Sequence, residues 1–430
     1  MEPRSSQTTG NEIDVPVPTQ AMEDVGGPGA APMKSLDKTK NWFNAVAVVL
    51  LKSVLLFFLL NLLLYPVSLV MRPRKAAGPL ERYGEEKVLR AYPGWREEDI
   101  KTLLLETWRN PEQEYEPFTG FREIPFRGKF VNIDRAGFRF SKGQAPWPPR
   151  PEVTNVFVFG GSTTFGVGLP DDETIASYLQ ECAPANYPNS PLAVYNFGRP
   201  GYFSGQELIL FQGLLKAGFV PQVAVFIDGF NDFFFPDGQP RYTGTLRRVM
   251  AGQASSGPLN NMPVVWAVHW LRAHWRKAQP QEGPDYADPE VLQQIIHRWL
   301  ANKVMIEAVA VAFGVRTVFV WQPVPMYKYD LRYDLFSHYV KEFGPNARAE
   351  YGYKLMENLR AQGKLGRDML WLADMQQDKR ENLYVDNFHY TAPFSEEIAT
   401  RICRFLEEEH PEDRRRFALP QPPAARDRGQ

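Results

Sequence analysis

A serine between glycines directly follows an apolar run and is a candidate nucleophile. Residues 159–166 read FGGSTTFG, with Ser162 at the centre. A hydroxyl at the carboxyl edge of a parallel sheet faces the crevice in which ligands bind, and flanking glycines allow close approach of a substrate. The segment lacks the lysine of a phosphate-binding loop and the spacing of a dinucleotide-binding fingerprint. Taken alone, it is as compatible with an ordinary glycine-rich turn as with catalysis.

Two further blocks follow the next two apolar runs and carry candidate hydrogen-bond donors. Residues 196–201 read NFGRPG, and residues 228–232 read DGFND. An ester hydrolase needs N–H donors directed at the developing oxyanion, and the backbone amide of Gly201 with the side-chain amide of Asn231 would supply two of them without a charge. Each block by itself is more often a β-turn or the start of a helix.

The fourth block, YVDNFH at residues 384–389, supplies an aspartate and a histidine. Asp386 precedes His389 by three residues, so one turn of chain can bring the carboxylate to Nδ1–H and leave Nε2 free to accept a serine proton. A surface Asp–His pair near a helix start is an equally good interpretation of this block in isolation. The joint occurrence of four blocks, each after an apolar run, favours a triad of Ser162, His389 and Asp386.

The pattern of apolar residues predicts the elements that must position these blocks. Continuous apolar runs are typical of buried parallel strands, and the stretches between them have helical periodicity. The predicted strands are 155–159, 193–196, 223–227, 317–321 and a short last one at 383–385, and the predicted helices are 173–182, 206–217, 289–313 and 393–409. This alternation predicts an α/β fold, a three-layer α/β/α sandwich with a central parallel sheet.

The remainder of the chain is organised around this domain, which is predicted over residues 151–410. Residues 1–41 and 411–430 have the composition of disordered tails. Residues 72–150 are predicted to be a linker and N-terminal extension, with a helix at 97–108 and strands within 126–140. Residues 236–288 contain several tryptophans and are too long for an ordinary βα connection, so they are predicted to be an insertion or lid.

An apolar run at residues 42–71 predicts a single transmembrane helix. Residues 53–71 carry no charge and approach the roughly 20 residues that span a bilayer core. A cleaved signal peptide is disfavoured because a mostly polar stretch precedes the run. Lysines or arginines flank both sides, so the positive-inside rule does not give an orientation.

Charge and cysteine content exclude some classes of protein. The 49 basic and 50 acidic residues nearly cancel, and no long basic cluster lies outside the chain ends, so nucleic acid is not an expected partner. Two cysteines, Cys182 and Cys403, are too few for a disulfide framework and lack the spacing of a zinc site. We predict buried or bystander thiols, with one mutual bridge left open.

In block order and spacing, residues 153–409 resemble the SGNH, or GDSL-type, serine hydrolase superfamily, in a membrane-anchored bacterial branch. The resemblance implies that Ser162 is the nucleophile, that Asp386 and His389 complete the triad, and that the Ser162 amide, Gly201 and Asn231 form the oxyanion hole. The name-giving Gly-Asp-Ser of the family is Gly-Gly-Ser here, as in related bacterial branches. Residues 131–139 are similar to a lead-in found before such domains, and no catalytic role is predicted for them.

These observations predict a membrane-anchored serine esterase that hydrolyses carboxylic esters, O-acetyl esters first, on glycans or lipids. It would need no metal or organic cofactor, and its catalytic domain would be periplasmic or otherwise extracytoplasmic. Two alternatives remain open: an O-acyltransferase that uses the same triad, and a catalytically inactive glycan-binding or assembly protein. A third possibility is that the tryptophan-rich insertion docks on the bilayer as an amphipathic lid, which would make the enzyme a lipase.

Overall fold

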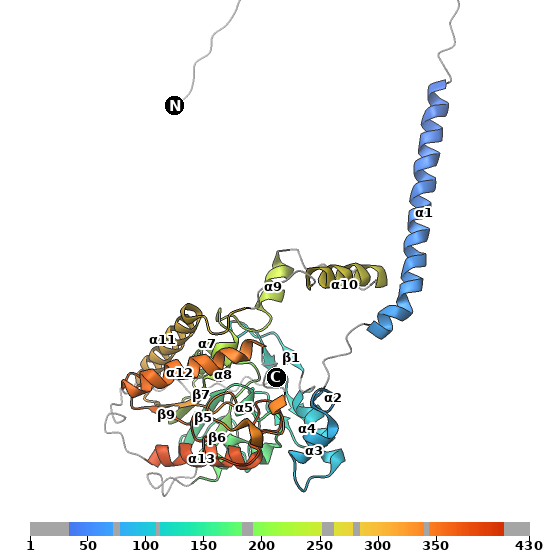
Figure 1. The fold of residues 1–430 in the computed structure, drawn as a ribbon. Coiled ribbons are helices and arrows are strands. Elements are labelled where there is room, and N and C mark those ends of the chain that lie inside the picture. The colour runs from blue at the N-terminus through green and yellow to red at the C-terminus, as the bar shows by residue number, and fades with distance from the viewer. Residues whose placement is uncertain are drawn as a thin grey trace, which may run out of the picture. The chain divides into compact units, whose positions relative to one another are not determined.

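The computed structural model of the protein describes residues 34–71, 78–108, 112–182, 192–251, 262–277, 284–338 and 344–407. These residues fall into two compact units, whose elements are drawn in Figure 1. The smaller unit contains helix α1 (Lys34–Met71) and nearly all of helix α10 (Pro263–Lys277). The larger unit contains the other elements. Most of the predicted N-terminal tail and all of the C-terminal one lie outside the described residues.

The larger unit is built on a parallel five-stranded sheet with strand order β6-β5-β7-β8-β9. Its strands are β5 (Thr154–Gly160), β6 (Leu192–Asn196), β7 (Val223–Asp228), β8 (Arg316–Trp321) and β9 (Met369–Trp371). The first four overlap predicted strands and confirm them. The strand predicted at residues 383–385 is wrong, because there the chain forms only an isolated bridge between Tyr384 and Tyr390. The fifth strand is instead β9, at the edge of the sheet next to β8, and it is too short to show a periodic pattern.

Alternation along β5 gives the two faces of the sheet different side chains. Phe157 and Phe159 pack on the face covered by α7, α11 and α12, whereas Val156 and Val158 pack on the face covered by α6 and α13. Successive side chains of a strand point to opposite faces, so both faces of β5 are buried. The sheet therefore lies between two helical layers, as predicted (Figure 1). The covering helices are α6 (Ile175–Gln180), α7 (Ser204–Lys216), α11 (Pro289–Phe313), α12 (Arg348–Ala361) and α13 (Ala392–Glu407).

A row of stacked phenylalanines lies on the first of these faces. The rings of Phe197, Phe159, Phe226 and Phe319 stack in that order, with centroids 5.7, 4.9 and 5.3 Å apart. Cross-strand aromatic pairs stabilise a sheet through both burial and ring geometry. The row gives a rigid base to the ends of β5, β6 and β7, from which the first three of the four sequence blocks emerge.

The N-terminal extension packs on this sheet domain close to two of the blocks. Its elements are α2 (Pro79–Tyr83), α3 (Glu85–Arg90), α4 (Glu97–Trp108), β1 (Gln113–Glu114), β2 (Arg122–Glu123), β3 (Phe126–Arg127) and β4 (Asn132–Ile133). The prediction of a helix at 97–108 is confirmed, and β3 and β4 lie within the predicted strand region. One apolar cluster joins Tyr83, Leu103 and Ile133 of the extension to Phe165 and Val385, which adjoin the serine and histidine blocks.

Helix α1 is long and apolar enough to cross a membrane, by length and composition. The qualifying stretch is Lys38–Leu69, and an 18-residue window within it has a mean hydropathy of 2.6. The helix begins at Lys34, ahead of the predicted start at Trp42. The insertion at residues 236–288 contains α9 (Thr243–Met250) and α10 among its described residues.

Cys182 and Cys403 form a disulfide, with their Cα atoms 6.2 Å apart. Cys182 follows α6 and Cys403 lies in α13, two helices that pack together on one face of the sheet. The prediction of bystander thiols is therefore wrong. The two residues are 221 positions apart, and only the packing of α6 on α13 brings them together.

Candidate active site

Three of the predicted residues form one continuous hydrogen-bonded chain. Ser162 begins the short helix α5 (Ser162–Phe165) directly after β5, and its Oγ lies 2.9 Å from Nε2 of His389. On the other side of the imidazole, Nδ1 lies 2.6 Å from Oδ2 of Asp386. This is the order of contacts in which a carboxylate orients a histidine that can take the serine proton.

The loop that carries Asp386 and His389 is closed on itself. Oδ1 of Asp386 accepts hydrogen bonds from the backbone N–H groups of Phe388 and His389, each at 2.9 Å. The N–H of Val385 donates to the carbonyl of His389 at 2.8 Å. With Oδ1 occupied in this way, Oδ2 is held towards the imidazole, which favours the tautomer with its proton on Nδ1.

Neighbouring atoms leave no room for a side chain at either of the two glycines before Ser162. A Cβ at Gly160 would lie 2.1 Å from Oγ1 of Thr164, and the φ of Gly160 is +155°. A Cβ at Gly161 would lie 2.2 Å from Nδ2 of Asn231. The side-chain amide of Asn231 therefore lies directly against the backbone that precedes the serine.

Asn231 connects the serine turn to the Gly201 loop. It lies in α8 (Phe230–Phe234), which follows β7, and its Nδ2 donates to the carbonyl of Tyr202 at 2.6 Å. Gly201 has φ +87°, a conformation that favours glycine. Within the described part of the chain, the N–H groups of Ser162 and Gly201 donate to no protein acceptor. The structure thus gathers the three predicted oxyanion donors at one end of the sheet.

Three carboxyl groups are buried together beneath these donors: Glu207, Asp228 and Asp232. Asp232 accepts a hydrogen bond from Oγ of Ser204 at 2.6 Å, and Asp228 accepts one from Nε1 of Trp299 at 3.2 Å. Burial, together with the neighbouring Asp232, raises the pKa of Asp228 to about 8. Burial also raises the pKa of Glu207 and of Asp232. Asp228 is therefore mainly protonated at pH 7, and the cluster joins the starts of α7 and α8.

Arg139 supports the serine helix and was not singled out as a functional residue from the sequence. Its side chain is completely buried and forms an ion pair with Asp171 at 2.9 Å. Its guanidinium also donates to the carbonyls of Phe165, Gly166 and Leu169 at 2.6–2.8 Å. Arg139 therefore fixes the end of α5, the helix that begins with Ser162. The only sequence signal is an arginine between two phenylalanines within the segment for which no role was predicted.

Other residues of the extension contact the histidine loop. The ring of Trp108 meets that of His389 edge-on, with centroids 5.7 Å apart and an interplanar angle of 89°. The hydroxyl of Tyr83 donates to Oδ1 of Asn387 at 2.6 Å. Trp108 is half-buried, so it forms a wall beside the imidazole. No local pattern in the sequence distinguishes Trp108 or Tyr83 from ordinary core residues.

Contacts of the same kind support the Gly201 loop and the start of α5. Arg199 pairs with Glu116 of the extension at 2.5 Å, and the hydroxyl of Tyr202 donates to the carbonyl of Phe121 at 2.5 Å. Gln322, which follows β8, is buried, and its Oε1 accepts a hydrogen bond from Thr163 at 3.0 Å. Gln322 therefore supports the residue next to Ser162.

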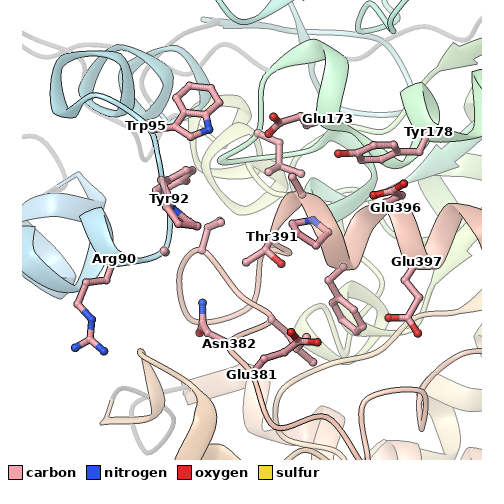
Figure 2. Close-up of a pocket in the computed structure, with 18 residues that line it drawn as sticks. Arg90, Tyr92, Trp95, Glu173, Tyr178, Glu381, Asn382, Thr391, Glu396 and Glu397 are labelled. Carbon is pink, nitrogen blue, oxygen red and sulfur yellow. The ribbon is translucent and has the colours of Figure 1, made fainter.

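A pocket of about 590 Å³ borders the histidine loop but does not contain the serine (Figure 2). Val385 and Thr391 line it on either side of that loop, with Tyr92 and Trp95 of the extension opposite. Neither Ser162 nor His389 is among its lining residues. The reaction that the triad could perform would therefore take place outside this pocket.

No protein-family model matches the chain, and no curated protein matches it. Among solved structures, a lipase/acylhydrolase from Enterococcus faecalis aligns at 13% identity over 59% of this chain and 96% of its own, with a TM-score of 0.31. A psychrotrophic esterase from Pseudoalteromonas aligns at 13% identity over 59% and 97%, with a TM-score of 0.32. A lipolytic protein of the G-D-S-L family from Veillonella parvula aligns at 10% identity over 58% and 96%, with a TM-score of 0.31. Likenesses this weak do not assign a function.

Proposed function

We propose that this protein is a membrane-anchored serine esterase that hydrolyses carboxylic esters on glycans or lipids, with O-acetyl esters as its first expected substrates. The observation that carries the proposal is the chain of contacts from Ser162 Oγ to His389 Nε2 at 2.9 Å and from His389 Nδ1 to Asp386 at 2.6 Å. The nucleophile, the base and the carboxylate that orients the base are hydrogen-bonded in the order that acyl transfer requires.

In the proposed reaction, Oγ of Ser162 attacks the ester carbonyl carbon while its proton passes to Nε2 of His389. The oxyanion of the tetrahedral intermediate accepts hydrogen bonds from the N–H groups of Ser162 and Gly201 and from the amide of Asn231. His389 then gives its proton to the leaving alkoxide, and the ester C–O bond breaks. A water molecule then gives a proton to His389 and attacks the acyl carbon. The bond between that carbon and Oγ of Ser162 breaks, His389 returns the proton to Oγ, and the acid is released.

The proposed anchor and compartment rest on two other features. Helix α1 has the length of a membrane-spanning helix and contains an 18-residue window with a mean hydropathy of 2.6. The disulfide between Cys182 and Cys403 lies in the sheet domain. Disulfides persist mainly in oxidising compartments, so it supports a catalytic domain on the extracytoplasmic side of the membrane.

The test is hydrolysis of p-nitrophenyl acetate and longer-chain esters by the full-length protein in detergent, beside its Ser162→Ala variant. We expect the variant to lose activity by about four to six orders of magnitude. Labelling of Ser162 with a fluorophosphonate probe checks the nucleophile independently. Labelling without hydrolysis of any ester would favour an O-acyltransferase. A folded protein that shows neither labelling nor hydrolysis would refute the proposal that the protein is an enzyme.

A further inference from the structure

The side chains of α1 are exposed except along one stripe. Between residues 38 and 69, where side chains are described, Phe57, Asn61 and Leu64 are half-buried and Ser68 is buried. Spacings of three and four residues place all four on one face of the helix. The segment that groups with α1 as one compact unit includes most of α10 from the insertion.

Asn61 joins the two helices. Its Oδ1 accepts a hydrogen bond from the backbone N–H of Val264 at 3.1 Å, and its Nδ2 donates to the carbonyl of Phe57 at 2.8 Å. Because α10 begins at Pro263, the N–H of Val264 is one of the first N–H groups of a helix, which have no acceptor within it. Asn61 therefore caps α10 from a neighbouring helix.

This contact has a particular value in a bilayer. Hydrocarbon offers no water to an unpaired backbone N–H or to an asparagine side chain, and each is costly there without a partner. The pair between Asn61 and Val264 satisfies both groups at once. The polar side chain of Asn61, which lies between Leu60 and Leu62, is thus explained by the helix that it caps.

The depth of the contact fits the edge of a membrane. Tyr65 lies near the C-terminal end of the apolar stretch of α1. Aromatic residues of this kind favour the two interfaces. Asn61 precedes Tyr65 by four residues, or about 6 Å, and amphipathic helices lie about 5–10 Å into the interface.

One side of the exposed surface of α10 is apolar. Val268, Leu271 and Trp275 are 42%, 59% and 82% exposed, and their spacing of three and four residues aligns them along the helix. His269 and Arg272, also exposed, lie further round the helix. A row of large apolar side chains beside a membrane span is unfavourable in water and favourable among acyl chains.

We propose that α10 is a second membrane element, an amphipathic helix that lies in the membrane interface. Asn61 fixes it to α1, and Val268, Leu271 and Trp275 contact lipid acyl chains. The proposal rests on the proposed anchoring role of α1 and is independent of the esterase activity.

The test uses the full-length protein reconstituted in vesicles of phosphatidylcholine and phosphatidylglycerol. Both native cysteines are in the disulfide, so Leu271→Cys supplies one free thiol for an environment-sensitive fluorophore. We expect a blue shift of its emission and several-fold weaker quenching by iodide in vesicles than in the unfolded chain. Nitroxides near the headgroup end of the acyl chains should quench the label more strongly than nitroxides at the chain ends. The matched control, His269→Cys on the polar side of α10, should remain accessible to iodide.

The Asn61→Leu variant separates docking from anchoring. It should still float with vesicles, because α1 becomes more apolar, but the label at position 271 should regain access to iodide. Equal iodide access at positions 271 and 269, in a chain that floats with vesicles, would overturn the proposal while leaving the anchor intact. A chain that does not float with vesicles would refute the anchor and this inference together.

Discussion

The carboxylate of Asp386 makes two kinds of contact, and they have different consequences. One oxygen holds the backbone of the histidine loop, and the other holds Nδ1 of His389. An amide at this position can keep the first contact but offers an N–H to the imidazole in place of the second. The resulting tautomer carries its proton on Nε2 and cannot accept one from serine.

Asp386→Asn should therefore lower kcat for p-nitrophenyl acetate by about 10⁴-fold with little change in thermal unfolding. The exposed Asp378, changed to asparagine, is the control and should behave as wild type. A kcat of Asp386→Asn within tenfold of wild type would count against its role in the triad.

The buried Asp228 makes the free energy of unfolding depend on pH, and its raised pKa sets the direction of that dependence. The folded chain keeps a proton up to about pH 8, whereas an unfolded aspartate releases it near pH 4. Between these values the unfolded state binds fewer protons, so the free energy of unfolding falls as pH rises, by up to about 1.4 kcal/mol per pH unit. The contribution is complete below about pH 4 and lost as pH approaches 8.

Asp228→Asn removes this titration while keeping an acceptor for Trp299. We expect a shallower decline in stability between pH 5 and pH 8, measured by urea unfolding at each pH. Asp378→Asn should keep the wild-type slope. Identical slopes for Asp228→Asn and wild type would show that Asp228 does not hold the proton.

At the scale of elements, α5 is only four residues long and cannot hold the serine by itself. Arg139 donates hydrogen bonds to three carbonyls at and just beyond the end of α5, and it forms an ion pair with Asp171. Its pKa is lowered by burial, and that of Asp171 is raised mainly by burial. Removal of either partner leaves the other buried and unpaired.

Arg139→Met should cost about 3–5 kcal/mol of unfolding free energy, because it breaks a buried ion pair by deleting one partner. It should also lower kcat, because the serine helix loses its support. Arg135→Met, at an exposed position four residues away, should cost less than about 0.5 kcal/mol. Chemical denaturation and kcat measured on both variants check the prediction, which fails if Arg139→Met matches Arg135→Met.

At the scale of the whole molecule, the disulfide joins α6 to α13 across most of the sheet domain. Such a bond restricts the unfolded chain, so its removal should destabilise the fold even where no other contact changes. The same bond would hold the last helix of the domain in place behind the histidine loop.

Replacement of Cys182 and Cys403 by serine should therefore lower the unfolding free energy by about 2–5 kcal/mol. Addition of reductant should lower the melting temperature of the wild type and leave that of the double variant unchanged. A reductant effect of equal size on both proteins would mean that the bond does not form.

Elements with strong local patterns could be predicted from the order of residues alone. The four buried strands are short continuous apolar runs, the helices at 97–108 and 289–313 have helical periodicity, and the apolar helix is a long run of apolar residues. The placement of Ser162, Gly201 and Asn231 at one edge of the sheet also follows from the sequence, because parallel strands all end on the same side. Asp386 and His389 lie in a loop that no strand of the sheet directly precedes, so the contact of His389 with Ser162 depends on the tertiary structure.

The distant segments that support the site could not be predicted in this way, because they depend on how the chain packs. Arg139, Trp108 and Tyr83 act through contacts with residues far along the chain, and a buried arginine or tryptophan has the same local pattern whatever it touches. The disulfide and the cap that Asn61 provides for α10 depend likewise on helix packing, as does the choice of β9 over residues 383–385 as the fifth strand. Local periodicity encodes which face of an element is buried, but not the partner that buries it.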